Sequence, residues 1–196
     1  MSAILKRREI VAALLQERGE LLVVAGLGST AWDVSAAGDS PLSFPLWGAM
    51  GAAAMVGLGL ALAQPARRVL VITGDGEMLM GLGSLATIGV QRPRNLAIAV
   101  IDNERYGETG MQATHTASGV DLAGVARACG LGASAVVWTE AEFAAARKAL
   151  LGQPGPVLMQ IKVLAEKIPL VLPPRDGGLL KARFRRAVLG PQADAE

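Results

Sequence analysis

The sequence predicts an α/β fold, an open parallel sheet with helices on both faces. Short segments rich in Val, Ile and Leu alternate with helical segments along almost the whole chain, which is the order of a parallel sheet with helical crossovers. The segments "RRVLVITG" and "NLAIAVID" are apolar without alternation, as expected for strands that are covered on both faces. The 196 residues are enough for one domain with its own core.

The first half of the chain is expected to contain two helices and two strands. Residues 3–17 have the apolar spacing of an amphipathic helix, and residues 20–26 form a short strand that ends in Gly. Residues 27–45 are rich in Gly, Ser, Asp and Pro, which predicts a loop. Residues 46–63 predict a helix rich in Gly and Ala, and residues 67–74 predict the next strand.

The second half continues the alternation. A helix is expected over residues 82–91, a strand over 95–102 and a polar loop over 103–119. The following segments are expected to be helix, strand, helix and strand in turn: "VDLAGVARACG", "SAVVW", "EAEFAAARKALL" and "PVLMQIKV". We therefore expect one domain over residues 1–165. A tail over 166–196 carries a short helix that packs on the domain or on a partner.

Composition excludes several classes of function. Nineteen basic and 17 acidic residues give a net charge of +2, too balanced for an electrostatic binder of nucleic acid. The single cysteine, Cys129, excludes a disulfide framework and a Cys-ligated iron–sulfur or zinc site within the chain, and it fits a cytoplasmic location. Residues 40–66 carry no charge, but their Gly and Ala content favours a buried helix over a membrane span.

Two oxygen-bearing side chains follow two successive predicted strands. Asp75 lies between Gly74 and Gly76 after the first strand, and Asn103 follows the second strand 28 residues later. Ligands bind outside the carboxyl ends of parallel strands, and carboxylate and amide oxygens suit Mg²⁺ or Ca²⁺. The spacing therefore favours a divalent ion that holds a diphosphate, although a strand-end turn at Asp75 and a capping role for Asn103 remain the alternative.

The segment "GDGEMLMGLGSLATIGVQRPRNLAIAVIDN" resembles the thiamine-diphosphate motif, in which GDG is followed by an Asn after somewhat under thirty residues. Upstream, "WGAMGAAAMVGLGLALA" resembles the segment that holds the aminopyrimidine ring in thiamine-diphosphate decarboxylases. The resemblance runs from about Gly26 to Val163 and covers the pyrophosphate-binding (PP) domain. It implies the PP-domain fold, with thiamine diphosphate and Mg²⁺ as cofactors.

The resemblance also implies roles for individual residues. Asp75, the side chain of Asn103 and the backbone carbonyl of Arg105 would ligate Mg²⁺. Gly48 would offer its carbonyl to the cofactor's amino group, and Met50 would be the wedge under the bent cofactor. Further cofactor contacts are implied for Ser29, Thr30, Gly74, Gly76, Glu77, Tyr106, Gly107, Glu108 and Thr109.

Glu77 departs from the family pattern, and the loop after Asn103 offers candidates for contact with the substrate. Glu77 stands where many members have Ser, and a carboxylate would be repelled by a diphosphate. We therefore expect its side chain to turn away, so that only its backbone N–H contributes. In the loop that follows Asn103, Thr109, Gln112, Thr114 and His115 could bind a substrate anion or an intermediate. His115 is the only histidine, and with Met50 it is the candidate for a direct catalytic role.

The resemblance places the carboxylate that activates the cofactor on a separate pyrimidine-binding (PYR) domain. The chain is therefore expected to be one half of a split enzyme with a PYR-domain α subunit, β–β self-association in a heterotetramer and a small anionic 2-oxoacid substrate. The pattern is most similar to the β subunits of sulfopyruvate decarboxylase, with phosphonopyruvate decarboxylase nearby. Arg175, Lys181 and Arg183 in the tail could bind the substrate, but surface placement is favoured.

Four alternatives remain open at this stage. An acetolactate-synthase-like carboligase half would use the same cofactor core. A 2-oxoacid:ferredoxin oxidoreductase β subunit would need all its clusters on partners. A non-catalytic cofactor-binding subunit and a nucleotide-binding Rossmann protein are disfavoured, the latter because no proper G-x-G-x-x-G follows the first strand.

Overall fold

The computed structural model describes residues 5–194. Its centre is a six-stranded sheet in the order β2-β1-β3-β4-β8-β7, in which every neighbouring pair is parallel. The predicted α/β class and open parallel sheet are thus confirmed. The strands are β1 (Leu22–Ala25), β2 (Ser43–Pro45), β3 (Val69–Gly74), β4 (Leu96–Asp102), β7 (Ala133–Val137) and β8 (Val157–Lys162).

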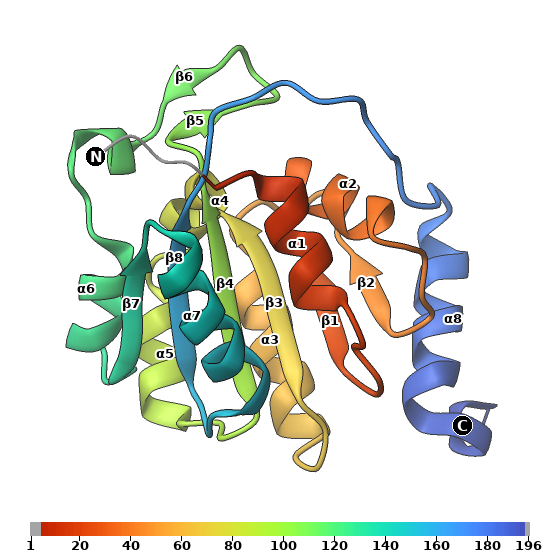
Figure 1. The fold of residues 1–196 in the computed structure, drawn as a ribbon. Coiled ribbons are helices and arrows are strands. Elements are labelled where there is room, and N and C mark those ends of the chain that lie inside the picture. Colours follow the sequence, from red (N-terminus) through yellow and green to blue (C-terminus); the bar gives the residue numbers. More distant parts are fainter. Residues whose placement is uncertain (1–4, 195–196) are drawn as a thin grey trace.

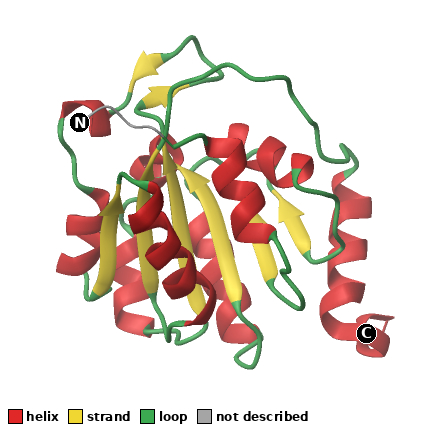
Figure 2. Ribbon diagram, viewed as in Figure 1, coloured by secondary structure: helices red, strands yellow, loops and turns green. Residues whose placement is uncertain are grey.

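Helices cover both faces of this sheet (Figures 1 and 2). The apolar cluster on one face includes α1, α2 and α7, and the cluster on the other includes α3, α5 and α6. The helices are α1 (Arg7–Leu15), α2 (Ser29–Ala36), α3 (Ala53–Ala63), α4 (Asp75–Met80), α5 (Ser84–Gln91), α6 (Leu122–Ala128), α7 (Glu140–Gly152) and α8 (Gly177–Leu189), with 3₁₀ turns η1 (His115–Ser118) and η2 (Gly190–Asp194).

The two-sided cover explains why the strands are apolar without alternation. Along β3, Leu70 and Ile72 pack into the cluster with α1, α2 and α7, whereas Val69 and Val71 pack into the opposite cluster. Successive side chains of a strand point to opposite faces, so both sets must be apolar. None of the helices in residues 5–194 has the length and apolar character needed to cross a membrane.

Three segments differ from the sequence-based expectation. The loop expected over 27–45 contains α2 and β2, because Thr30, Ala31 and Val34 bury one side of a short helix despite its polar composition. The helix expected from residue 46 begins only at Ala53, since Ala49 and Gly51 have positive φ values of 56° and 93°. The polar loop after β4 contains a hairpin of β5 (Arg105–Tyr106) and β6 (Gln112–Ala113), followed by η1.

After β8 the chain crosses the carboxyl ends of the strands as an extended strap, residues 163–176 (Figure 1). The strap is held by backbone hydrogen bonding to Leu5, by Arg8, which donates to the carbonyl of Pro169 at 2.8 Å, and by Trp47, which donates to that of Pro174 at 2.8 Å. These contacts tie the tail to the end of the sheet where ligands are expected.

Helix α8 then packs beside the edge strand β2 (Figure 1). The Phe44 and Phe184 rings lie 5.2 Å apart, and Arg183 forms an ion pair with Asp39. The cover shields a strand edge that would otherwise be open to pairing. The domain boundary at residue 165 remains a prediction.

Candidate functional site

A pocket of about 390 Å³ lies at the carboxyl ends of the central strands, between the loop after β1, the start of α4, the β5–β6 hairpin and the strap. Open parallel sheets bind ligands at this edge, and the volume is typical of a site for a small ligand or cofactor. Its walls bring together segments that are far apart in the sequence.

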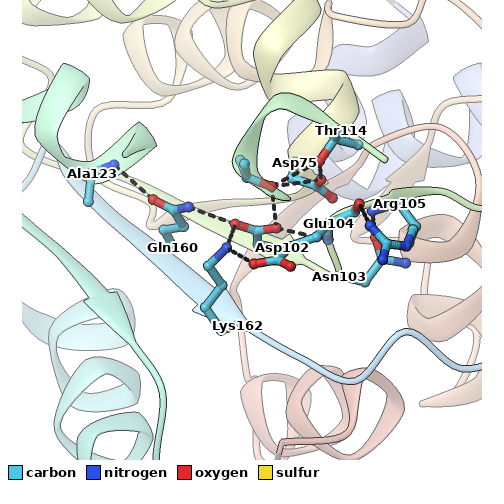
Figure 3. Close-up of polar contacts among 10 residues, drawn as sticks. Asp75, Asp102, Asn103, Glu104, Arg105, Thr114, Ala123, Gln160 and Lys162 are labelled. Atoms are coloured by element: carbon cyan, nitrogen blue, oxygen red, sulfur yellow. Dashed lines mark hydrogen bonds and ion pairs between the residues drawn. The ribbon is translucent and has the colours of Figure 1, made fainter. Parts of the chain in front are cut away.

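The two oxygen-bearing residues expected at this edge lie just beyond neighbouring strands. The backbone register of β3 and β4 pairs Gly74 with Ile101, and Asp75 and Asn103 follow these strands in the same direction. Both residues line the pocket. The arrangement places a carboxylate and an amide oxygen at one end of the sheet (Figure 3).

Asp75 is the first residue of α4, and its side chain is buried. Thr114 Oγ1 donates a hydrogen bond to Asp75 Oδ2 at 2.5 Å, and Thr116 Oγ1 donates a longer one to the same oxygen at 3.3 Å. Burial and the nearby Asp102 carboxylate raise the pKa of Asp75 to about 6. Both hydrogen bonds fall on Oδ2, which leaves Oδ1 for a ligand.

The turn after β4 is shaped by side chains that accept from the backbone two residues on. The Glu104 N–H donates to Asp102 Oδ1, and the Arg105 N–H donates to Asn103 Oδ1, each at 3.0 Å. Glu104 has a φ of 61°, in the left-handed region that non-glycine residues seldom adopt. The turn thereby brings the side chain of Asn103 and the backbone of Arg105 to the same pocket.

A buried polar network lies behind this turn (Figure 3). Asp102 Oδ2 accepts from Gln160 Nε2 at 2.6 Å and pairs with Lys162 Nζ at 2.8 Å, and its Oδ1 accepts from Thr116 at 2.8 Å. Burial lowers the pKa of Lys162, but the hydrogen bonds and charges of Asp102 and Glu104 outweigh burial and leave this pKa raised. No signal in the sequence marked this network, because its members lie on separate elements.

The opposite wall of the pocket holds a buried arginine. Arg7 from α1 pairs with Asp33 of α2 at 2.5 Å and donates to the Ser29 carbonyl at 3.1 Å. Arg8 also pairs with Asp33 at 3.0 Å. Gly28 and Ser29 form the start of α2 beside Arg7, so a guanidinium and a Gly-containing turn share one wall.

Glu77 turns into the protein rather than toward solvent. It is only 4% exposed, and Thr73 Oγ1 donates to its Oε2 at 2.8 Å. Burial raises its pKa, although the nearby N–H groups of Ala53, Gly51 and Leu27 oppose that effect. No described group reaches hydrogen-bond geometry with Oε1. The Glu77 side chain therefore lies between the loop that follows β1 and the segment that precedes α3.

Three aromatic or apolar side chains, Tyr106, Met50 and Trp32, complete the walls. A Cβ on Gly76 would lie 2.4 Å from the Tyr106 ring, so the ring packs directly on the glycine backbone. Met50 and Trp32 line the pocket from other sides.

The structure brings most of the residues predicted for the site to this pocket. Those that line it are Ser29, Met50, Gly74, Asp75, Gly76, Glu77, Asn103, Arg105, Tyr106, Gly107, Glu108 and Thr109. Thr30 is buried and donates to the Gly26 carbonyl at 2.9 Å, while Gly48 and His115 are exposed and outside the lining. The roles assigned to all these residues remain predictions.

Sequence reasoning missed other lining residues. They are Arg7, Leu27, Gly28, Trp32, Ile101, Met111, Glu166, Lys167, Ile168 and Leu170. Gly28 directly precedes Ser29, a predicted contact, and could have been found from that neighbour. The α1 and strap residues could not, because only the folded chain brings them to the strand ends. Arg175, Lys181 and Arg183 of the tail are likewise absent from the lining, in line with the favoured surface placement.

The donor set fits a hard divalent cation. Asp75 and Asn103 supply a carboxylate and an amide oxygen, and the Arg105 carbonyl belongs to the same turn. Within residues 5–194 no three His, Cys, Asp or Glu side chains gather as a metal cluster. This matches Mg²⁺, which takes few protein ligands and completes its shell with water and phosphate oxygens.

Comparison with protein families gives an independent result. Residues 27–161 match the family model described as "Thiamine pyrophosphate enzyme, C-terminal TPP binding domain". A solved benzoylformate decarboxylase from Polynucleobacter necessarius is 21% identical, with a TM-score of 0.70. The match covers 85% of this chain but only 34% of that one, so the chain spans about a third of the structure it resembles.

Curated relatives are more similar in sequence. The sulfopyruvate decarboxylase subunit beta of Methanocaldococcus jannaschii is 41% identical over 64% of this chain and 67% of its own length. That of Methanococcus maripaludis is 34% identical over 94% of this chain and 98% of the relative. The phosphonopyruvate decarboxylase of Streptomyces viridochromogenes is 38% identical over 93% of this chain and 47% of the relative.

Proposed function

Since the chain belongs to the thiamine pyrophosphate enzymes, as their C-terminal cofactor-binding domain, we propose that it is the diphosphate-binding subunit of a 2-oxoacid decarboxylase. In this proposal thiamine diphosphate is held through Mg²⁺, and a second subunit completes the site. The substrate is a 2-oxoacid with a further anionic group, such as sulfopyruvate or phosphonopyruvate.

The observation that carries the proposal is the pairing of Asp75 and Asn103 at the ends of β3 and β4, in one pocket. One hard cation held by these oxygens and by the Arg105 carbonyl would bind the two phosphates from one side. Arg7, with its guanidinium at the opposite wall, would offset their remaining charge.

The cofactor, when bound, supplies an electron sink for the carbanion that decarboxylation leaves. Within this chain, Met50 would support the cofactor ring from the pocket wall, and Gly48 would accept from the ring's amino group. The carboxylate that activates the ring would come from another chain. Relatives named "subunit beta" support this division, because one of them matches over 98% of its length.

The second subunit would bind over helices α3, α4 and α5. Met55, Leu62, Met80 and Val90 are large apolar side chains on these helices, and they are 42%, 50%, 65% and 78% exposed. Exposed large apolar side chains are typical of protein–protein contacts where they lie together, as Met55 and Met80 do. Met55 and Met80 flank a hollow that includes Gly51, the neighbour of Met50, so a partner seated there would reach the cofactor ring.

The anionic end of the substrate would meet the strap. Lys167 and Arg105 are cations that line the pocket, and Lys167 is exposed to solvent. Glu166 and Glu108 line the pocket beside them. A sulfonate or phosphonate carries one or two negative charges beyond the oxoacid, and a lysine or arginine would pair with them.

The test is reconstitution. We expect the chain, co-expressed with the product of the neighbouring open reading frame, to release CO₂ from sulfopyruvate or phosphonopyruvate only with thiamine diphosphate and Mg²⁺. The chain alone should show little or no turnover. Robust turnover by the single polypeptide would refute the division into subunits, and products of condensation instead of the free aldehyde would identify a carboligase.

A variant tests the metal assignment separately. Asp75→Ala should abolish Mg²⁺-dependent binding of thiamine diphosphate in the complex, measured by calorimetry. Asp176→Ala is the matched control, because Asp176 caps α8 and does not line the pocket. Titration of the Asp75 variant that resembles wild type would rule out this cation site.

A further inference from the structure

Lys162 lies directly behind the turn that presents the proposed cation ligands. It is the last residue of β8 and is 5% exposed. Its Nζ lies 2.8 Å from Asp102 Oδ2 and 2.7 Å from Glu104 Oε1 (Figure 3). These two partners are the residues on either side of Asn103, so one ammonium group holds both flanks of a proposed ligand.

The turn needs such support because its backbone is unusual. Glu104 has a φ of 61° without being glycine, a conformation that persists only where the surroundings impose it. Its N–H donates to Asp102 Oδ1 at 3.0 Å, and its carbonyl accepts from the Thr114 N–H at 3.0 Å. Among the described residues, Lys162 forms the only ion pair of the Glu104 side chain.

The same lysine acts on the other cation ligand through a chain of contacts. Thr116 Oγ1 donates to Asp102 Oδ1 at 2.8 Å and lies 3.3 Å from Asp75 Oδ2. Asp102 and Asp75 are both buried carboxylates. Because both contact the hydroxyl of Thr116, they are close enough for their negative charges to repel each other. The ammonium group of Lys162 compensates the charge of Asp102, which keeps Asp102 in place between the two ligands.

We propose that Lys162 is a positioning residue that sets the geometry of the cation site through Asp102 and Glu104. It does not line the pocket, and it would touch neither the cation nor the cofactor. The inference rests on the proposed function in one respect, the binding of Mg²⁺ with thiamine diphosphate. Lys162 also lies 5.4 Å from the centre of the Trp138 ring, so a purely structural role is the competing explanation.

The experiment compares two variants that remove contacts of the turn with one variant that removes a contact elsewhere in the protein. Lys162→Met removes the ammonium group. Glu104→Gln removes the charge of one of its partners at a side chain that is 37% exposed, where we expect little loss of stability. Arg68→Met is the control, because Arg68 donates to the Leu150 carbonyl at 2.7 Å and lies outside the pocket. Mg²⁺ is titrated by calorimetry into each protein, co-purified with its partner subunit, at saturating thiamine diphosphate. Thermal midpoints are measured in parallel.

We expect the Lys162 and Glu104 variants to bind Mg²⁺ at least tenfold more weakly than wild type. Arg68→Met should lower the thermal midpoint and leave Mg²⁺ affinity within twofold. The inference would be overturned if both Lys162→Met and Glu104→Gln bound Mg²⁺ as tightly as wild type. It would also be overturned if Arg68→Met lost as much Mg²⁺ affinity as they do. If Lys162→Met does not fold, the Glu104 result decides. If wild type itself shows no Mg²⁺-dependent binding, the proposed function fails and the inference with it.

Discussion

Asp75→Asn should stabilise the cofactor-free protein at neutral pH. The folded structure raises the pKa of Asp75 to about 6 from a usual value of 3.8, chiefly through burial and then through Asp102. As pH rises, this carboxyl group ionises in the unfolded chain before it ionises in the folded one. Ionisation therefore favours unfolding. The cost is absent below about pH 4, grows as pH rises toward 6 and is complete above that value.

The size of the effect follows from the gap between the two pKa values. It corresponds to about 3 kcal/mol at pH 7, an upper bound for a single buried carboxylate. Asn cannot ionise and can still accept the hydrogen bond of Thr114. Urea unfolding at pH 7 without Mg²⁺ should therefore show Asp75→Asn to be about 1–3 kcal/mol more stable than wild type. At pH 4 the difference should fall to about 0.5 kcal/mol, because most of it arises between pH 4 and 6.

A second buried carboxylate serves as the contrast. Burial raises the pKa of Asp33 as well, but Asp33 differs from Asp75 in that it pairs with Arg7 and Arg8 at 2.5 and 3.0 Å. Asp33→Asn should therefore destabilise the protein by about 3 kcal/mol, because it leaves the buried Arg7 without a counter-charge. Mg²⁺ with thiamine diphosphate should stabilise wild type and not Asp75→Asn. The reasoning is refuted if Asp75→Asn is no more stable than wild type at pH 7, or if its advantage is the same at pH 4.

Three further predictions concern other parts of the molecule. Gly26→Ala would place a Cβ 1.8 Å from Glu77 Oε2, so it should cost about 1–3 kcal/mol in urea unfolding, and adding Glu77→Ala should recover part of that loss; additive losses would argue against the contact. Phe184→Ala should destabilise by about 3 kcal/mol because it removes the ring packed on Phe44 at 5.2 Å, and an unchanged unfolding midpoint would mean that α8 does not hold the sheet edge. Lys167→Ala should raise KM for sulfopyruvate about tenfold and leave KM for pyruvate nearly unchanged, and equal effects on both substrates would exclude a contact with the anionic tail.

The sequence was sufficient for the central strands and for where they end, but not for the edge strand β2. Continuous apolar runs such as Leu96–Asp102 identify strands that are covered on both faces, and their alternation with helices predicts a parallel sheet. Because Asp75 and Asn103 directly follow two such runs, their common location could be predicted without knowing the loops. Helix α2 was missed because Gly, Ser and Asp within it are typical of loops, whereas its burial depends on tertiary packing.

The pocket walls from α1 and the strap could not be predicted, because nothing local marks Arg7 or Lys167 as neighbours of Asp75. Their placement depends on how the chain ends fold over the sheet. For Glu77 we expected from the sequence a side chain that turns away from phosphate. In the structure the Glu77 side chain turns inward, and its Oε2 accepts from Thr73 Oγ1 at 2.8 Å. Its contact with the cofactor stays a prediction.

Three buried aspartates near the pocket differ in how their charge is compensated, and the difference indicates which aspartate is suited to a ligand cation. Asp33 has two arginines, and Asp102 has Lys162 and Gln160. Asp75 has, among the described residues, only the hydroxyls of two threonines on one of its oxygens. Hydroxyl groups orient a buried carboxylate but do not neutralise it. Of these three aspartates, two are paired with cations and the third, Asp75, is left to hydroxyls, which suits it to an external cation. Removal of its charge should therefore both stabilise the protein and abolish its cofactor binding.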